Sequence, residues 1–123
     1  MVTFDTPDLA REIEKLDEQS IDALPFGAIR LDRSGAVTFF SKAERELSGY
    51  GARPTIGKIF FTDIAPCMAN EGFRGRLEAA RARGTLDLQF SWIGDFADRQ
   101  RELRVRVQSA SDGGVWIFIR RQI

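Results

Sequence analysis

Residues 25–49, PFGAIRLDRSGAVTFFSKAERELSG, decide the fold of this chain. The segments FGAIRLD and AVTFF are rich in β-branched and aromatic residues, and the RSG between them is typical of a turn, so this part predicts a β-hairpin. The SKAERELSG that follows predicts a short helix opened by Ser41 and closed by Gly49. We therefore expect a hairpin that leads directly into a helix.

The sequence before the hairpin predicts a short amphipathic helix. Thr6 and Pro7 have the residue types of a helix N-cap and first helical position, and Leu9, Ile13 and Leu16 follow at helical spacing. A second short turn, SIDAL, completes this N-terminal part.

After a mixed stretch of loops and short turns, the sequence predicts one longer helix and three strands. Asn70 is expected to cap a helix that ends at Gly84. Residues 85–93 and 102–109 alternate as half-buried strands do, and VWIFIRR (residues 115–121) is apolar on both faces, as expected of a central strand.

This order of elements predicts a single α+β domain with the PAS fold. In this fold a five-stranded antiparallel sheet is flanked by helices that cover one of its faces. We interpret residues 1–25 as an N-terminal helical cap and residues 26–123 as the PAS core.

The composition argues against most enzyme classes. The chain has 123 residues, 18 basic and 18 acidic side chains, one cysteine and no histidine. The lack of histidine excludes a histidine-ligated haem and a catalytic triad, and a zinc site is implausible with a single cysteine. We therefore expect a binding or sensing domain, not an enzyme.

Charge and hydropathy also bear on partners and location. The balanced charge gives no reason to expect nucleic acid, and we interpret Arg74, Arg76, Arg81 and Arg83 as a solvated helix face. No segment has the roughly 18 apolar residues of a membrane span, and the N-terminus lacks a signal-peptide pattern. A lone cysteine is typical of a reducing compartment, so we expect a cytoplasmic protein.

Two residues have competing interpretations when they are considered without a family. Cys67 is a buried hydrophobe, a redox-sensing thiol, a nucleophile or an anchor for a covalently bound group. Glu44 lies three residues after Ser41, which fits a capping box in which its carboxyl bonds to the Ser41 N–H.

Three segments together resemble the photoactive yellow protein family: PFGAIRLDRSGAVTFFSKAERELSG, IGKIFFTDIAPC and WIFIRR. The resemblance runs in register over nearly the whole chain. It implies that p-coumaric acid (4-hydroxycinnamic acid) is bound as a thioester on Cys67, the cysteine of the APC motif. It also implies that Glu44, kept protonated by burial, donates a hydrogen bond to the chromophore phenolate.

Three neighbours of Glu44 are also expected near the chromophore. Ser48 keeps the hydroxyl of the family's threonine, whereas Phe40 replaces a tyrosine that donates to the phenolate and Tyr50 replaces an arginine that covers the ring. These departures leave the phenolate with one strong donor and no nearby guanidinium. We therefore expect a raised phenol pKa, anion absorption further to the red and some neutral phenol near neutral pH.

The pocket walls are expected to be mostly aromatic, because aromatic rings pack well against a planar cinnamoyl group. The residues expected there are Ile29, Phe60, Phe61, Ile64, Phe90, Trp92 and Phe96. The loop at residues 93–99 resembles the family least, with Gly94 and Asp98 in place of a phenylalanine and a methionine.

The resemblance implies a blue-light photoreceptor. Trans–cis isomerisation would be followed by proton transfer from Glu44, which leaves a buried carboxylate without a partner and loosens the N-terminal cap. The expected partners are the chromophore and an unknown downstream signalling protein, and the expected state is a monomer or weak dimer. The alternatives are a PAS module for protein interaction or aromatic-ligand sensing without the native chromophore, and a redox-sensing thiol.

Overall fold

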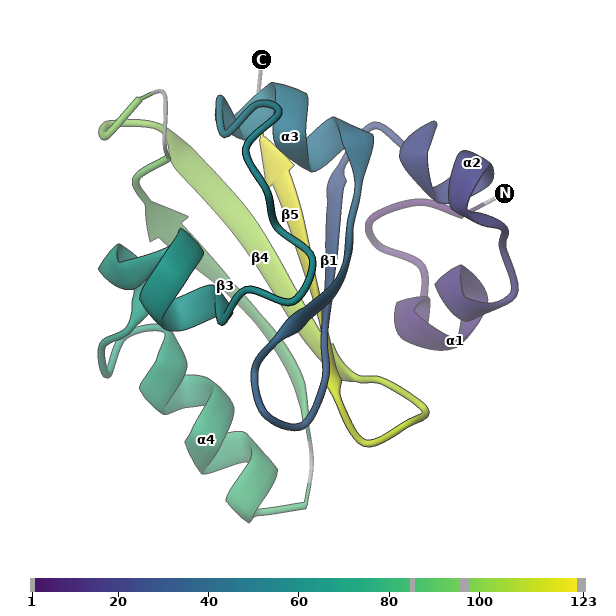
Figure 1. Ribbon diagram of the computed structural model, residues 1–123. Coiled ribbons are helices and arrows are strands. Elements are labelled where there is room, and N and C mark those ends of the chain that lie inside the picture. The colour runs from purple at the N-terminus through teal and green to yellow at the C-terminus, as the bar shows by residue number, and fades with distance from the viewer. Residues whose placement is uncertain (1, 85, 96–97, 122–123) are drawn as a thin grey trace.

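The computed structural model describes residues 2–84, 86–95 and 98–121. Five strands form one antiparallel sheet in the order β2–β1–β5–β4–β3, which confirms the predicted fold (Figure 1). No helix in this described part has the length and apolar character needed to span a bilayer. In chain order the elements are α1 (Leu9–Glu14), α2 (Glu18–Asp22), β1 (Gly27–Leu31), β2 (Val37–Phe40), α3 (Lys42–Ser48), the π-helix η1 (Phe60–Ile64), the 3₁₀ helix η2 (Pro66–Met68), α4 (Arg74–Ala82), β3 (Asp87–Ile93), β4 (Glu102–Ser109) and β5 (Val115–Arg121).

Strand β5 is the central strand, as its sequence predicts. It pairs with β1 on one side and with β4 on the other. Alternate side chains of a strand point to opposite faces of the sheet. Ile117 and Ile119 belong to one core cluster, whereas Trp116 and Phe118 belong to another. The two sets are at most 2% exposed, so β5 is buried on both faces.

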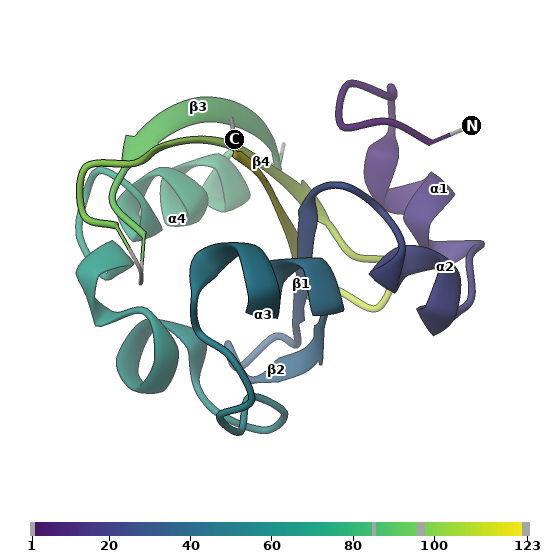
Figure 2. The ribbon, with the colours of Figure 1, turned by 90° about the horizontal axis from the view of Figure 1, so that it is seen from above.

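Helices cover both faces of the sheet. Figures 1 and 2 show α3 and α4 on one face and the cap helices α1 and α2 on the other. The cap contributes Leu9, Ile13 and Ile21 to the cluster that contains Trp116 and Phe118. The cap is therefore an integral layer of the fold.

Polar side chains of β4 hold the cap to the sheet. Arg106 donates from Nη1 to the carbonyls of Phe4 and Thr6, at 2.7 and 2.8 Å. The Gln108 side-chain oxygen accepts from the Ala10 N–H at 2.7 Å. Both β4 side chains are buried, so these bonds give the cap a defined position in addition to its apolar contacts.

Two helices begin later than the sequence predicts. The Thr6 hydroxyl accepts from the Thr3 N–H at 2.9 Å, so it organises the turn before α1. Asn70 likewise accepts from the N–H groups of Gly72 and Phe73, at 3.0 and 3.2 Å, before α4 begins. The expected N-caps were wrong because these side chains bond within the preceding turns, an alternative that short polar residues offer the backbone.

Candidate functional site

A pocket of about 550 Å³ lies between the sheet and the segment η1–η2, with α3 at one end. This volume is within the roughly 300–1,000 Å³ of typical small-molecule sites. Helix α3, segment η1–η2, the end of β3 with its following loop, and β5 all contribute to the lining. The lining residues are Glu44, Phe60, Ile64, Ala65, Pro66, Cys67, Met68, Trp92, Ile93, Gly94, Asp95, Arg99, Ile119 and Arg121.

Cys67 is exposed and lines this pocket. Pro66 opens the short helix η2 immediately before it, and the Cys67 carbonyl accepts from the Asn70 side-chain amide at 3.0 Å. These features fix the backbone of the turn. The thiol is therefore accessible to an acylating reagent, and a group attached to it has a pocket to enter.

Glu44 reaches the same pocket from α3 and is only 2% exposed. The close approach of its carboxyl requires the glycine at the start of β1, because a Cβ on Gly27 would lie 2.0 Å from Glu44 Oε1. Ser41 caps α3 by accepting from the Glu44 N–H at 3.2 Å. The reciprocal bond of a capping box is absent here: the Ser41 N–H donates to the Ala28 carbonyl at 2.9 Å.

The carboxyl of Glu44 instead pairs with Arg121 at the end of β5. Arg121 Nη1 donates to Oε1 at 2.8 Å, and Nη2 donates to Oε2 at 2.9 Å. Arg121 also donates from Nε and Nη2 to the two carboxylate oxygens of Asp95, at 2.6 and 3.2 Å. The expectation that an ionised Glu44 is a buried carboxylate without a partner was therefore wrong. The prediction considered only the positions beside Glu44 in sequence, whereas the arginine comes from the far end of the chain.

Burial and pairing act in opposite directions on this cluster. Burial raises the pKa of Glu44 above its ordinary value, as does the nearby Asp95 charge, and the bonds from Arg121 oppose this rise. Burial would lower the pKa of Arg121, but its bonds to Glu44 and Asp95 outweigh burial and raise it. Arg121 therefore remains a cation, and Glu44 is the group of this pair whose protonation state can change.

The other expected neighbours of the chromophore, Phe40, Ser48 and Tyr50, are not among the residues that line the pocket. Phe40 and Tyr50 are buried, with their ring centroids 5.7 Å apart. Arg45 lies 5.3 Å from the Phe40 ring and Arg53 lies 4.1 Å from the Tyr50 ring, so guanidinium groups are close to both positions. The buried Ser48 hydroxyl accepts from the Tyr50 N–H at 3.1 Å.

The expected pocket walls divide into three groups. Phe60, Ile64 and Trp92 line the pocket. Ile29 and Phe90 are buried in the core cluster on the same face of the sheet, and Phe61 packs against that cluster. Phe96 lies outside the described residues, so its expected role stays a prediction.

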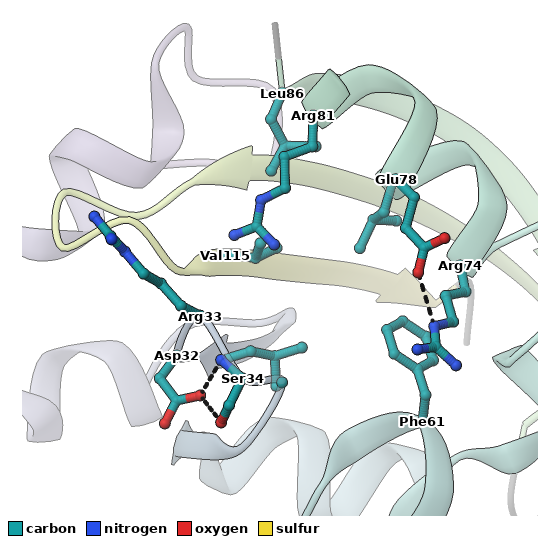
Figure 3. A pocket seen from close by; sticks show the side chains of 12 residues that line it. Asp32, Arg33, Ser34, Phe61, Arg74, Glu78, Arg81, Leu86 and Val115 are labelled. Atoms are coloured by element: carbon teal, nitrogen blue, oxygen red, sulfur yellow. Dashed lines mark hydrogen bonds and ion pairs between the residues drawn. The ribbon is translucent and has the colours of Figure 1, made fainter. Parts of the chain in front are cut away.

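A second pocket, of about 140 Å³, lies between the β1–β2 turn and α4 (Figure 3). Arg74 and Arg81 of α4 line it, together with Asp32, Ser34 and Phe61. Figure 3 shows Asp32 bonded to Ser34, and Arg74 bonded to Glu78 at 3.0 Å. No cysteine lines this smaller pocket, so a thioester cannot form there.

The larger pocket combines an accessible nucleophile, a buried acid and an apolar wall, which suits a planar group held at one end by a covalent bond. Sequence reasoning missed Arg121 and Asp95. Strand alternation contains a signal for the first, because Arg121 follows Ile117 and Ile119 at period two and therefore falls on their face of β5. In the described residues there is no group of three side chains that could hold a metal ion.

Comparison with known proteins agrees with this architecture. The family model for the PAS fold matches residues 15–121. The chain is 36% identical to the photoactive yellow protein of Rhodothalassium salexigens and 34% identical to that of Halochromatium salexigens, over 98% of each chain.

Two solved structures are also similar. The photoactive yellow protein domain from the sensor histidine kinase Ppr of Rhodospirillum centenum superposes with a TM-score of 0.80 at 36% identity, covering 91% of this chain and 99% of that one. A PAS domain from Colwellia psychrerythraea has a TM-score of 0.64 at 15% identity, covering 89% of this chain and 97% of that one, and shows the fold alone.

Proposed function

Because this chain belongs to the photoactive yellow protein family and has the PAS fold, we propose that it is a blue-light photoreceptor that carries p-coumaric acid as a thioester on Cys67. The observation that carries this proposal is that the exposed Cys67 thiol and the buried Glu44 carboxyl line one pocket. The two residues come from separate elements, so the fold has brought an anchor and an acid to the same cavity.

Attachment requires an activated acyl donor. The Cys67 thiol would lose its proton to solvent, and the thiolate would attack the carbonyl carbon of an activated p-coumaroyl group. A C–S bond would form as the bond to the leaving group breaks. Phe60 and Trp92 supply ring surfaces against which a planar group packs. The residues present therefore fit this group.

The bound chromophore supplies absorption of blue light and a trans–cis isomerisation. Glu44 is the protein's proton donor, a role supported by the burial that raises its pKa. Donation of its proton to the phenolate oxygen would leave Glu44 ionised within the pocket. The cap then loosens and exposes the apolar faces of α1 and α2 to a downstream signalling protein, which we place in the cytoplasm with the receptor.

The test is a visible spectrum and an intact mass after the protein is incubated with activated p-coumaric acid. We expect a yellow product, a mass gain of one p-coumaroyl group, and loss of both in Cys67→Ala. Ile93→Ala is the matched control, because Ile93 also lines the pocket, is 67% exposed and offers no nucleophile. This control should keep the adduct.

A second function uses the same pocket without the thioester. Arg121 occupies both oxygens of Glu44, which favours a PAS module that senses another aromatic ligand or binds a protein partner. The absence of colour and adduct in the wild-type protein would exclude the first function and leave this one.

A further inference from the structure

The buried ion pair at the end of β5 affects how readily Glu44, which lines the pocket, gives up its proton. We infer that Arg121 is the counter-charge for Glu44: it binds the carboxylate that remains when Glu44 gives up its proton, so it makes Glu44 a readier donor and limits the loosening that follows. The signalling half of this inference rests on the proposed function. Its first half concerns only residues of this chain.

The hydrogen-bond geometry around Glu44 suits its ionised form, the form that remains after it gives up its proton. Both Glu44 oxygens accept from Arg121, at 2.8 and 2.9 Å, and a guanidinium only donates. A protonated carboxyl would carry an O–H and give up one of these bonds. Two parallel bonds to one carboxylate are among the stronger side-chain interactions. The pocket therefore already contains the arrangement that a deprotonated Glu44 requires.

The charges around Arg121 balance when Glu44 is ionised. Asp95, from the loop after β3, accepts from Arg121, and it also pairs with Arg101 Nη1 at 3.1 Å. Two guanidinium groups thus face two carboxylates. Arg99, from the same loop as Asp95, is the other charged group that lines the pocket. Loss of the Glu44 proton therefore brings the charges of Glu44, Asp95, Arg101 and Arg121 to a sum of zero, with Arg99 exposed to solvent. It does not leave an isolated buried charge, whose cost would be several kcal/mol.

Arg120 provides a matched comparison on the same strand. Alternation places it on the opposite face of β5, where its guanidinium lies 4.8 Å from the Phe4 ring and 3.4 Å from Asp5. Replacement of Arg120 by an uncharged residue removes a charge of the same sign from the position directly before Arg121 and leaves the Glu44 contact intact. A difference between the two positions therefore isolates the contact with Glu44 from the general effect of charge.

The first experiment needs no chromophore. In Cys67→Ala protein with ¹³C-labelled glutamate, NMR follows the titration of the Glu44 carboxyl, with Glu44→Gln for assignment. We expect Arg121→Gln to raise the Glu44 pKa by about one unit or more, which is about a tenfold tighter binding of the proton. Arg121→Lys should give a smaller shift because it keeps the charge, and Arg120→Gln should give none. An unshifted Glu44 in Arg121→Gln would overturn the inference.

A second variant covers the case in which Arg121→Gln does not fold. Asp95→Asn leaves Arg121 in place and removes the negative charge of the second carboxylate that Arg121 binds. The pKa of Glu44 should therefore fall. A Glu44 pKa that stays in place or rises in Asp95→Asn would contradict the inference.

The signalling half is tested in protein loaded with p-coumaric acid. Hydrogen exchange of the α1 and α2 amides under illumination should be faster in Arg121→Gln than in wild type when the two are compared at equal bleached fraction. Equal exchange would overturn this half. Failure to form the adduct would instead refute the proposed function, and the NMR titration would still decide the role of Arg121.

Discussion

Phe40 stands where we expect a missing hydroxyl to affect the proposed chromophore. Its ring is 6% exposed and packs against Tyr50. A phenylalanine has no donor to offer, so in the proposed receptor the phenolate oxygen would have one hydrogen bond fewer than with a tyrosine at this position. A bond to a charged oxygen contributes about 1.5–3 kcal/mol, which corresponds to about one to two units of pKa.

Phe40→Tyr should therefore lower the phenol pKa of the loaded protein by about one to two units and move the anion absorption to the blue. The measurement is a pH titration of the visible spectrum. Phe39→Tyr is the matched control, because Phe39 packs against the cap-side cluster on the other face of the sheet. If Phe40→Tyr leaves the spectrum unaltered, position 40 does not contact the chromophore.

Sequence reasoning identified Cys67 and Glu44, which both line the pocket, but it missed Arg121, the cation paired with Glu44. Cys67 lies in a local motif, and Glu44 lies in a helix whose boundaries are visible in the sequence. Arg121 is 77 residues from Glu44, and only the pairing of β5 with β1 places the two side chains together. Such a partner depends on strand order, which local patterns do not contain.

Glu14 is a second polar link between helix α1 and the sheet, in addition to the bond between Gln108 and Ala10. Its Oε2 accepts from the Trp116 indole N–H at 3.0 Å and from the Ser111 N–H at 2.9 Å, and it lies 3.3 Å from Arg30. Burial acts to raise the pKa of Glu14, but these hydrogen bonds and the nearby arginines outweigh it, and the pKa is lowered. The ionised side chain therefore stabilises the docked cap.

This link predicts a pH dependence of cap docking. Because the pKa of Glu14 is lower in the folded protein than its ordinary 4.5, the stabilisation is complete above that pH and is lost as the pH falls through the folded value. Glu14→Gln should weaken docking by about 1 kcal/mol at neutral pH and remove this part of the acid sensitivity. The Trp116 indole N–H resonance reports the docked state.

Glu12→Gln is the control for this experiment, because Glu12 lies on the same helix and pairs only with the exposed Lys15 among the described residues. If Glu12→Gln changes the acid response as much as Glu14→Gln does, net charge and not the Glu14 contact governs docking.

At the scale of elements, the strands and the start of α3 at Ser41 could be predicted, whereas the starts of α1 and α4 could not. The period-two alternation of β4 and the double-sided apolar run of β5 are direct consequences of burial. Helix starts depend on which N–H a short polar side chain accepts from, and Thr6 and Asn70 each have more than one choice nearby. Patterns of residue type do not decide between such choices.

The whole molecule contains two cores separated by one sheet. The pocket belongs to one side, and the cap closes the other over Phe26, Trp116 and Phe118. Sequence analysis predicted the cap and the core as successive segments. It did not predict that they are opposite layers, because the same pattern of elements permits either arrangement.

Deletion of residues 1–22 should therefore leave the pocket in place and uncover an apolar face. We expect the shortened protein to associate, because contiguous apolar surface of this kind is rarely left exposed in monomers. Its free energy of unfolding should also fall. Size-exclusion chromatography with light scattering and urea unfolding measure both effects, against the full chain at equal concentration.

Acylation of Cys67 should survive this deletion, as judged by intact mass. A shortened protein that is monomeric and as stable as the full chain would show that the cap contributes little to the fold.

The two-sided burial of β5 restricts how a change in the pocket can reach the cap. A slip of the strand by one residue would turn Ile117 and Ile119 toward the cap and Trp116 and Phe118 toward the pocket, so sliding along the strand is excluded. The motion that remains is a small bend or tilt of the β5 backbone, which displaces side chains on both faces of the sheet at the same time. The distance that a signal travels is then the thickness of a single polypeptide layer, and no relay of intermediate side chains is needed.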